Sequence, residues 1–462
     1  MSSTARPSYE PASPAPLTKL ATAGGLGNFL EWFDFAAYGF FAASIGRVFF
    51  PSDDPTTSLL SSLAVFGVAF VVRPLGGITV GAIGDRLGRR AALSLTVLLM
   101  GVATTLMALL PGYDAIGVAA PILLVLLRCT QGLAAGGEWA GAASFLVEYA
   151  PRQHRGLWGS ILTSTAAMGA VVGCFVAVIL DSVLTVEQLD SWGWRVPFLL
   201  ATPLVGAGLY VRLRLEDTPA FRALQQEHKL ARSPLREAFA RHKKSMTLVF
   251  FCSAVHGVCF YYLATYVINF LTSAQIGMNR TQALVGTAIG LSIYTVLCPL
   301  AGIVSDRIGR RPSMLVGSAA MAVLAIPAFI LIAQGSLWTT IVGMTMLAVF
   351  EALVNVTTLV LLIEMFPTST RMSGGSTGYN LALAAIAGPA PLIAAAVAAN
   401  VDLVGSAAFY MVAVAAIGFV VLLIWLPETV GNPLLTDDDT ADTAGTAADS
   451  AVPERKLTER AN

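Results

Sequence analysis

The residues best suited to chemistry are acids set inside long apolar stretches. In the first stretch Glu31 and Asp34 lie three positions apart, with Asn28 and Tyr38 one helical turn before and after them. Residues three or four apart share a helix face, so these side chains form one polar stripe. Two carboxylates one turn apart repel, and this repulsion favours proton binding by one of them. We predict that Asp34 or Glu31 binds and releases a proton. The alternative is that Glu31 forms a hydrogen bond with a neighbouring helix and does not bind or release a proton.

Two arginines lie inside the apolar stretches that follow. Arg73 precedes Pro74 and two glycines, which allow helices to approach closely, and Arg128 has Gln131 one turn further on. A guanidinium is a planar fork that matches a carboxylate. Arg73 therefore either holds an external carboxylate or pairs with Asp34 or Glu31. Glu138, further along the same stretch as Arg128, is predicted to hydrogen-bond across to another helix.

Polar side chains recur at helical spacing in the second half of the chain. Glu351 lies in the middle of an apolar stretch, where a charge is costly and marks a functional site. It either offsets Arg128 or Arg73 or forms a second proton site. His256, by contrast, is interpreted as a hydrogen-bonded packing residue. The other candidates for the site in this half are Tyr262, Tyr266, Asn355 and Tyr379.

Composition defines the class of protein. Of 462 residues, 56% are hydrophobic and only 12% are charged, against about 25% charged in soluble proteins. An apolar run of about 20 residues is long enough to span a bilayer as a helix. The chain therefore predicts an all-α integral membrane protein with twelve transmembrane helices. They are expected at 21–48, 58–83, 91–110, 116–147, 157–180, 194–214, 246–272, 281–304, 312–333, 337–363, 373–399 and 404–426.

The chain is a doubled unit. The pattern G-x-x-x-D-R-x-G-R-R occurs at Gly81–Arg90 and again at Gly302–Arg311, and a Glu-x-x-Pro-x-x-x-Arg pattern recurs at 148–155 and 364–371. Repeats of this kind predict two similar halves. The expected units are a disordered start (1–19), a six-helix bundle (20–214), a linker (215–245), a second six-helix bundle (246–427) and a disordered tail (428–462).

Basic residues gather in alternate links between the expected helices. The links 84–90, 150–155, 305–311 and 366–372 carry arginines, whereas the links between them carry acids, with Arg280 the main exception. Lys and Arg mark the cytoplasmic side of a membrane protein. Twelve spans return the chain to the side on which it began, so both termini are predicted to be cytoplasmic.

Further motifs carry a family resemblance. They include Gly27-Asn28-Phe-Leu-Glu31-Trp32-Phe33-Asp34, Arg73-Pro74-Leu-Gly76-Gly77, Arg128-x-x-Gln131-Gly132 with Gly136-Gly137-Glu138, and Glu216-Asp217-Thr218-Pro219. With the doubled G-x-x-x-D-R-x-G-R-R links, this set resembles the major facilitator superfamily (MFS), and more narrowly its metabolite:proton symporter family. Members import small organic acids or zwitterions with protons: 2-oxoglutarate, citrate, shikimate, proline and glycine betaine.

The resemblance implies two pseudo-symmetric six-helix bundles and assigns roles to residues. By analogy, Arg73 holds the substrate carboxylate and Arg128 handles substrate or protons, with Tyr38, Gln131, Tyr262, Tyr266, Asn355 and Tyr379 as further substrate residues. Asp34, Glu31 and Glu351 are the proton-coupling candidates. The doubled links resemble conformational latches, which names the gating residues Asp85, Arg86, Arg89, Arg90, Glu148, Arg155, Asp306, Arg307, Arg310, Glu364 and Arg371.

These observations favour a proton-coupled transporter over other classes of membrane protein. The expected partners are a small carboxylate-bearing substrate, protons and the lipid bilayer of the inner (cytoplasmic) membrane. No nucleic acid, cofactor, metal site or catalytic residue is expected, and the chain is expected to be a monomer. A proton-independent uniporter or exchanger of the same fold is the alternative, and a receptor or sensor is a more distant one. An enzyme is not expected, since no hydrolase or nucleotide-binding motif occurs.

Overall fold

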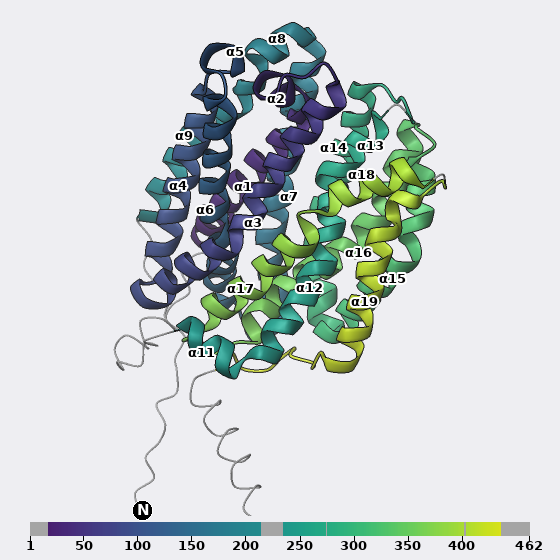
Figure 1. The fold of residues 1–462 in the computed structure, drawn as a ribbon. Coiled ribbons are helices and arrows are strands. Elements are labelled where there is room, and N and C mark those ends of the chain that lie inside the picture. Colours follow the sequence, from purple (N-terminus) through teal and green to yellow (C-terminus); the bar gives the residue numbers. More distant parts are fainter. Residues whose placement is uncertain (1–16, 214–233, 274, 402, 436–462) are drawn as a thin grey trace, which may run out of the picture.

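The computed structural model describes residues 17–213, 234–273, 275–401 and 403–435 (Figure 1). The described residues form helices and no strands. The first half contains α1 (Leu17–Phe40), α2 (Ala42–Phe49), α3 (Pro55–Leu87), α4 (Arg89–Leu109), α5 (Tyr113–Ile116), α6 (Ala119–Tyr149), η1 (Arg152–His154), α7 (Arg155–Val183), α8 (Val186–Ser191), η2 (Gly193–Arg195) and α9 (Val196–Leu213). The second half contains α11 (Pro234–Arg241), α12 (Lys243–Tyr261), η3 (Tyr262–Tyr266), α13 (Val267–Leu271), α14 (Arg280–Ile308), α15 (Arg310–Ile332), α16 (Leu337–Glu364), α17 (Arg371–Ala382), η4 (Leu383–Ala387), α18 (Ala390–Asn400), η5 (Ser406–Ala408) and α19 (Phe409–Trp425).

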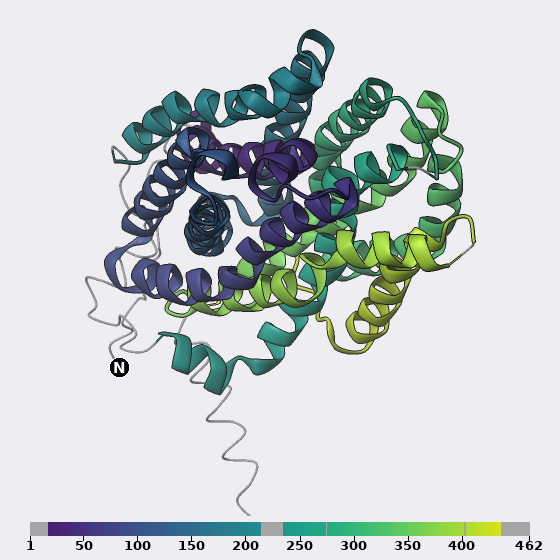
Figure 2. The same ribbon diagram turned by 45° about the horizontal axis from the view of Figure 1, so that its top comes forward.

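The helices are of membrane-spanning type. Within the described ranges, ten helical stretches are long and apolar enough to cross a bilayer. The other two predicted spans are occupied by α1 with α2, which carry buried charges, and by α9, which is 18 residues long. The prediction of an all-α membrane protein built from two six-helix bundles is confirmed, and Figure 2 shows the two bundles side by side.

The two bundles meet along two helix pairs that are related by the internal repeat. One pair is α7 with α14, which touch at Gly156 and Gly302 near one end and at Asp181 and Arg280 near the other. The second pair is α3 with α17. We call the face that carries the links 84–90, 150–155, 305–311 and 366–372 the basic face. Because α7 and α14 contact each other at both ends, they form the longer of the two seams.

Glycines bring α3 and α6 into backbone contact inside the first bundle. A Cβ atom added to Gly132 would collide with the carbonyl oxygen of Ala69, and one added to Gly136 would collide with that of Arg73. Small residues at a helix interface let the backbones approach this closely. The glycines that surround Arg73 and follow Arg128 in the sequence therefore serve to place the two arginine-bearing helices side by side.

Two expected spans are interrupted by a π-helical turn. The seventh span runs α12–η3–α13, and the eleventh runs α17–η4 and then, after Gly388 and Pro389, α18. A π-turn inserts an extra residue into the helical repeat, so it rotates the side chains that follow relative to an unbroken α-helix. Such turns occur often at functional sites.

The chain after α19 differs from the predicted disordered tail. Residues 428–435 lie along the basic face, where the carboxylate of Glu428 accepts hydrogen bonds from the backbone N–H groups of Arg310 and Arg311 at the start of α15. A carboxylate at a helix N-terminus is favourable because four N–H groups there lack helical partners. Burial alone would raise the pKa of Glu428, but the backbone N–H groups that donate to it hold that pKa below its usual range.

Other predicted boundaries fall partly outside the described residues. Residues 1–16, most of the predicted linker (214–233) and residues 436–462 are not described. The described end of the linker region is α11, a short helix that packs against α12, α17 and α3.

Close packing of α3 on α6 yields a stability prediction. Replacing Gly132 with Ala should lower the thermal stability of the purified protein, since overpacking costs about 1–3 kcal/mol. Gly67→Ala is the matched control, because Gly67 also lies in this helix pair and its added Cβ would meet no atom within 4 Å. Thermal unfolding followed by tryptophan fluorescence measures both variants. Equal melting temperatures for the two would contradict the close approach.

Candidate functional site

Two buried ion pairs occupy the middle of the first bundle. Nη2 of Arg73 (α3) lies 2.6 Å from Oε1 of Glu31, and Nη1 of Arg128 (α6) lies 3.1 Å from Oδ2 of Asp34. All four side chains are at most 1% exposed. The two acids that the sequence placed on one face of α1 therefore have separate partners on two other helices. In this structure Arg73 pairs with Glu31 rather than with Asp34.

The Asp34 pair belongs to a network of hydrogen bonds. The Thr104 hydroxyl donates to Oδ1 of Asp34 at 2.8 Å, Gln131 donates to Thr104 at 2.8 Å, and Arg128 donates to Gln131 at 2.7 Å. The Tyr38 ring lies flat against the guanidinium of Arg128, 3.6 Å from its Cζ atom. The predicted residues Tyr38 and Gln131 thus hold Arg128 in position.

The ring of Phe35 lies near both arginines. Its centroid lies 5.6 Å from Cζ of Arg73 and 5.5 Å from Cζ of Arg128. An aromatic face attracts a guanidinium. Phe35 therefore helps to stabilise both buried positive charges.

A third buried pair lies against the same face of α1, one helical turn before Glu31. Nη2 of Arg212 (α9) is 2.6 Å from Oε1 of Glu138, and Arg212 also donates to the carbonyl of Leu93. Gly27 makes room for this pair, since a Cβ there would collide with both side chains. The prediction that Glu138 is a cross-helix hydrogen-bond partner agrees with this geometry. Arg212 was missed, although a basic residue inside an apolar run is a visible signal.

Arg73 also reaches the second bundle. Its Nε donates to Oδ1 of Asn380 (α17) at 3.3 Å, and the side chains of Asn380 and Ser376 donate to the carbonyl of Gly136 at 2.5 and 2.7 Å. The Glu31–Arg73 pair therefore lies at the seam between the bundles that α3 and α17 form. The Asp34–Arg128 network, in contrast, is built from residues of the first bundle alone.

Aromatic rings from both bundles surround this seam. Trp32 contacts Phe260 at 4.6 Å between ring centroids, and Trp139 lies parallel to Tyr379 at 5.7 Å. We call the following residues the aromatic wall: Trp32, Phe70, Trp139, His256, Phe260, Tyr261 and Tyr379. All are buried, and they provide flat apolar faces next to the Glu31–Arg73 pair.

Several buried polar atoms at this wall have no hydrogen-bond partner among the described residues. They include Nη1 of Arg73 and Oε2 of Glu31. A buried polar group without a partner costs free energy, so a cluster of them marks a place where a ligand or water is expected. The others at the wall are Nε1 of Trp32, Nε1 of Trp139, and the hydroxyls of Tyr261 and Tyr379.

The second bundle contributes its own buried acid. Oε1 of Glu351 (α16) lies 2.6 Å from Nδ1 of His256 (α12), and the His256 ring packs parallel to Trp139 and Tyr379. Of the two alternatives for Glu351, an ion pair with Arg73 or Arg128 does not form in this structure, because its partner is His256. The alternative of a second proton site stays a prediction. Asn355, one turn on, donates to the hydroxyl of Tyr294 at 2.5 Å.

The structure places Tyr262 and Tyr266 away from these groups. Both rings pack on Phe329 of α15, and the Tyr262 hydroxyl donates to the carbonyl of Ala407. The aromatic wall instead receives Tyr261, the residue before the π-turn. The four-residue spacing assumed an unbroken α-helix and did not show which face of that helix meets the other bundle.

The basic face is closed by polar contacts that cross between the bundles. Oδ1 and Oδ2 of Asp306 accept hydrogen bonds from the backbone N–H groups of Gly156 and Leu157 at 2.8 and 2.9 Å, and Asp85 accepts one from Ser373 at 3.0 Å. Each aspartate thus caps the first turn of a helix in the opposite bundle, where a negative charge is favourable. The internal repeat therefore produces two equivalent latches.

Arginine–glutamate pairs reinforce both latches. Arg155 lies 3.1 Å from Glu364, and Arg371 lies 2.9 Å from Glu148, each across the seam. Arg310 binds both Asp306 and Glu364 at 2.9 and 3.4 Å. The remaining gating candidates are peripheral: Arg90 donates to the carbonyl of Leu213, Arg86 and Arg307 are exposed, and the side chain of Arg89 lies outside the described residues.

The opposite face also carries a contact between the bundles. Nε of Arg280 (α14) lies 3.0 Å from Oδ1 of Asp181 (α7), and its Nη2 donates to the carbonyl of Phe40 at the end of α1. A cation at a helix C-terminus is favourable because carbonyl groups there lack partners. Arg280 was visible in the sequence only as the exception among acidic links. In this structure it joins the two bundles.

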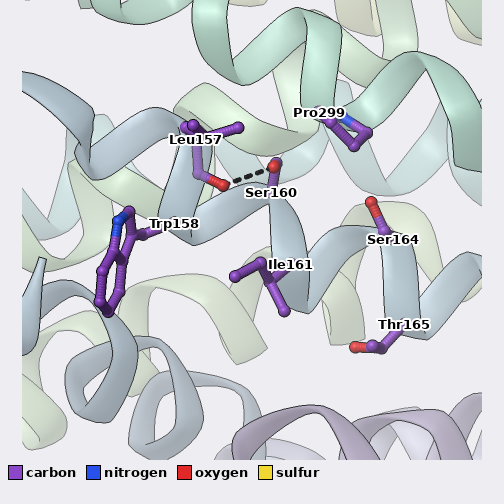
Figure 3. A pocket seen from close by; sticks show the side chains of 7 residues that line it. All are labelled: Leu157, Trp158, Ser160, Ile161, Ser164, Thr165 and Pro299. Atoms are coloured by element: carbon purple, nitrogen blue, oxygen red, sulfur yellow. Dashed lines mark hydrogen bonds between the residues drawn. The ribbon is translucent and has the colours of Figure 1, made fainter. Parts of the chain in front are cut away.

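Cavities elsewhere lack the groups expected of a substrate site. One, of about 370 Å³, lies between α7 and Pro299 of α14 and is lined by Leu157, Trp158, Ser160, Ile161, Ser164 and Thr165 (Figure 3). Another, of about 340 Å³, is lined by apolar residues of α15 and α16 and by Thr345. Neither has a charged residue in its lining.

This fold and its buried charges define a membrane transporter built from two bundles. The chain belongs to the major facilitator superfamily: residues 20–249 match the family model for sugar (and other) transporters, and residues 257–448 match the major facilitator superfamily model. Relatives that are transporters rather than enzymes cover most of it, so the chain is a multi-pass transporter of small molecules and not an enzyme.

Three comparisons illustrate these similarities. The chain is 38% identical over 430 residues to the glycine betaine/proline/ectoine/pipecolic acid transporter OusA of Dickeya dadantii, covering 90% of this chain and 85% of that protein. It is 36% identical over 388 residues to the shikimate transporter of Escherichia coli, covering 81% and 87%. The proton:xylose symporter XylE aligns with a TM-score of 0.73 at 16% identity, covering 90% of this chain and 97% of that one, which shows a shared fold.

The latches on the basic face yield a prediction about opening. Asp306→Ala removes the acceptor of two backbone N–H groups, and hydrogen bonds to a charged group contribute about 1.5–3 kcal/mol each. Hydrogen exchange measured by mass spectrometry should become about tenfold faster or more at the start of both α7 and α17. Exposed Arg307→Ala is the matched control and should leave both segments protected. Faster exchange at α7 alone would show that the two latches open independently.

Proposed function

We propose that the protein is a proton-coupled symporter that imports a small carboxylate-bearing metabolite by alternating access. The observation that carries this proposal is the pair of buried guanidiniums in the first bundle, each holding one carboxylate of α1. A buried charge is tolerated only when it is paired. A proton that neutralises one carboxylate therefore leaves an arginine in need of another anion.

Asp34 is the proposed coupling residue. Its partner Arg128 lies in a hydrogen-bond network of the first bundle with Gln131 and Thr104, so protonation of Asp34 would disturb this network. Phe35 touches both guanidiniums and lies beside Asp34 in the chain. A shift of this helix turn would carry the change at Asp34 to the Glu31–Arg73 pair.

Arg73 is the proposed anchor for the substrate carboxylate. It lies at the seam between the bundles, and its Nη1 has no hydrogen-bond partner among the described residues. The unpartnered indole N–H groups and tyrosine hydroxyls of the aromatic wall supply further donors. The substrate carboxylate would replace Glu31 on Arg73, which leaves Glu31 as a second proton acceptor.

Alternating access would then depend on the contacts at the two faces. By the positive-inside rule, the basic face is the cytoplasmic one, and both termini lie on that side of the inner membrane. With the latches of this face closed, release into the cytoplasm requires Asp306, Asp85 and their arginine–glutamate pairs to separate. The protein is proposed to act as a monomer, since each chain contains both bundles.

Replacing Asp34 with Asn tests the coupling. The variant should lose uphill accumulation of substrate driven by a pH gradient while it still exchanges substrate across proteoliposome membranes, because Asn cannot release a proton. Uptake with and without a protonophore measures the first property, and exchange of labelled for unlabelled substrate measures the second. Accumulation retained by Asp34→Asn would exclude this residue as the coupling site. Wild-type uptake that ignores the protonophore would favour a uniporter or exchanger instead.

A further inference from the structure

The second bundle contains a buried acid for which the proposed transport cycle has no use. Glu351 is fully buried, and its Oε2 has no hydrogen-bond partner among the described residues. Its other oxygen is bound by Nδ1 of His256 at 2.6 Å. This differs from Glu31, Asp34 and Glu138, each of which holds an arginine.

Among the residues that the structure describes, no lysine or arginine forms an ion pair with Glu351. The titratable groups that face its carboxylate are the thiols of Cys259 and Cys298 and the phenols of Tyr294 and Tyr379, all of them neutral or acidic. An imidazole is a weaker counter-charge than a guanidinium, since its neutral form is readily populated. A buried carboxylate in such a setting would be stabilised by a cation that comes from outside.

The route between Glu351 and Arg73 is lined by aromatic rings. His256, which binds Glu351, lies parallel to Trp139 and Tyr379 with ring centroids 6.5 Å away in both cases. Tyr379 in turn lies close enough to Arg73 and to Glu351 to feel both charges. Aromatic faces thus lie near both the guanidinium and the carboxylate. Aromatic faces bind quaternary and secondary ammonium groups.

We propose that Glu351, held by His256, is the residue that recognises the positively charged end of the substrate, so that the site selects zwitterions over dicarboxylates. This inference rests on the proposed function, in which Arg73 binds the carboxylate end. A zwitterion would then bridge the two bundles, with its carboxylate on α3 and its ammonium group against the aromatic wall and α16. A dicarboxylate would bring a second negative charge to Glu351 and be repelled.

The test compares two ligands of one shape. Glycine betaine and 3,3-dimethylbutanoate have the same carboxylate and the same branched head, but nitrogen carries a positive charge in the first and carbon carries none in the second. Binding of each to the purified full-length protein is measured by calorimetry. The wild type should bind glycine betaine about 30-fold more tightly or better, which corresponds to a desolvated cation–π contact.

Glu351→Gln should reduce this preference, since the aromatic wall stays in place but the negative charge is lost. We expect its affinity for glycine betaine to fall by about tenfold while its affinity for 3,3-dimethylbutanoate is unchanged. Glu351→Asp retains the charge and should keep part of the preference, so a loss caused by misfolding is recognisable. Glu237→Gln, the same exchange at a partly exposed position of α11, is the matched control and should behave as the wild type.

The outcomes separate this inference from the proposed function. A Glu351→Gln variant that keeps the full wild-type preference for glycine betaine would overturn the role of Glu351, as would a wild type that binds 2-oxoglutarate more tightly than glycine betaine. Arg73→Gln should weaken both isosteric ligands equally. If Arg73→Gln binds both normally, the proposed carboxylate anchor fails, whatever the result at Glu351.

Discussion

The structure depends on one electrostatic constraint: a guanidinium buried in a membrane bundle must hold an anion. Arg73 and Arg128 are fully buried, each pairs directly with a carboxylate of α1, and the Phe35 ring lies near both guanidiniums. Removing one partner of a buried pair costs about 3–5 kcal/mol, so neither arginine is left alone. Protonation and substrate binding therefore both change the charge balance around these arginines. When a proton neutralises one carboxylate, its arginine lacks a counter-charge that only another anion can supply. Binding of the proton and binding of the substrate therefore depend on each other.

Contacts made by the second bundle would link this exchange of ion-pair partners to a movement of the two bundles. Its contribution at the seam is mainly aromatic, through Phe260, Tyr261 and Tyr379, with Asn380 touching Arg73 directly. On the basic face each bundle caps a helix of the other with an aspartate, and on the opposite face Arg280 ties α14 to α7 and α1. A ligand that bridges the seam therefore competes with, or adds to, contacts that hold the bundles together.

Much of this arrangement could be predicted from the sequence, because membrane burial makes every internal charge conspicuous. Glu31, Asp34, Arg73, Arg128 and Glu351 stood out as costly residues in apolar runs, and the repeated motifs identified the residues of the latches. The partners of these charged residues were harder to predict, since the sequence does not state which helix faces which. Glu351, for example, pairs with His256 rather than with an arginine. The sequence also did not show that Tyr261, rather than Tyr262, faces the wall. The tail from Glu428 looked disordered because its order comes from distant helix ends.

The most direct test of the charge constraint measures when the basic face opens. Spin labels at exposed Leu87 and Ile308, at the ends of α3 and α14, report the distance between the bundles on this face. The account predicts that acidic buffer alone and substrate alone in alkaline buffer both leave the labels at the short distance, and that substrate in acidic buffer shifts the population to a longer one. Opening by substrate alone in alkaline buffer, to the same extent as in acidic buffer, would contradict it.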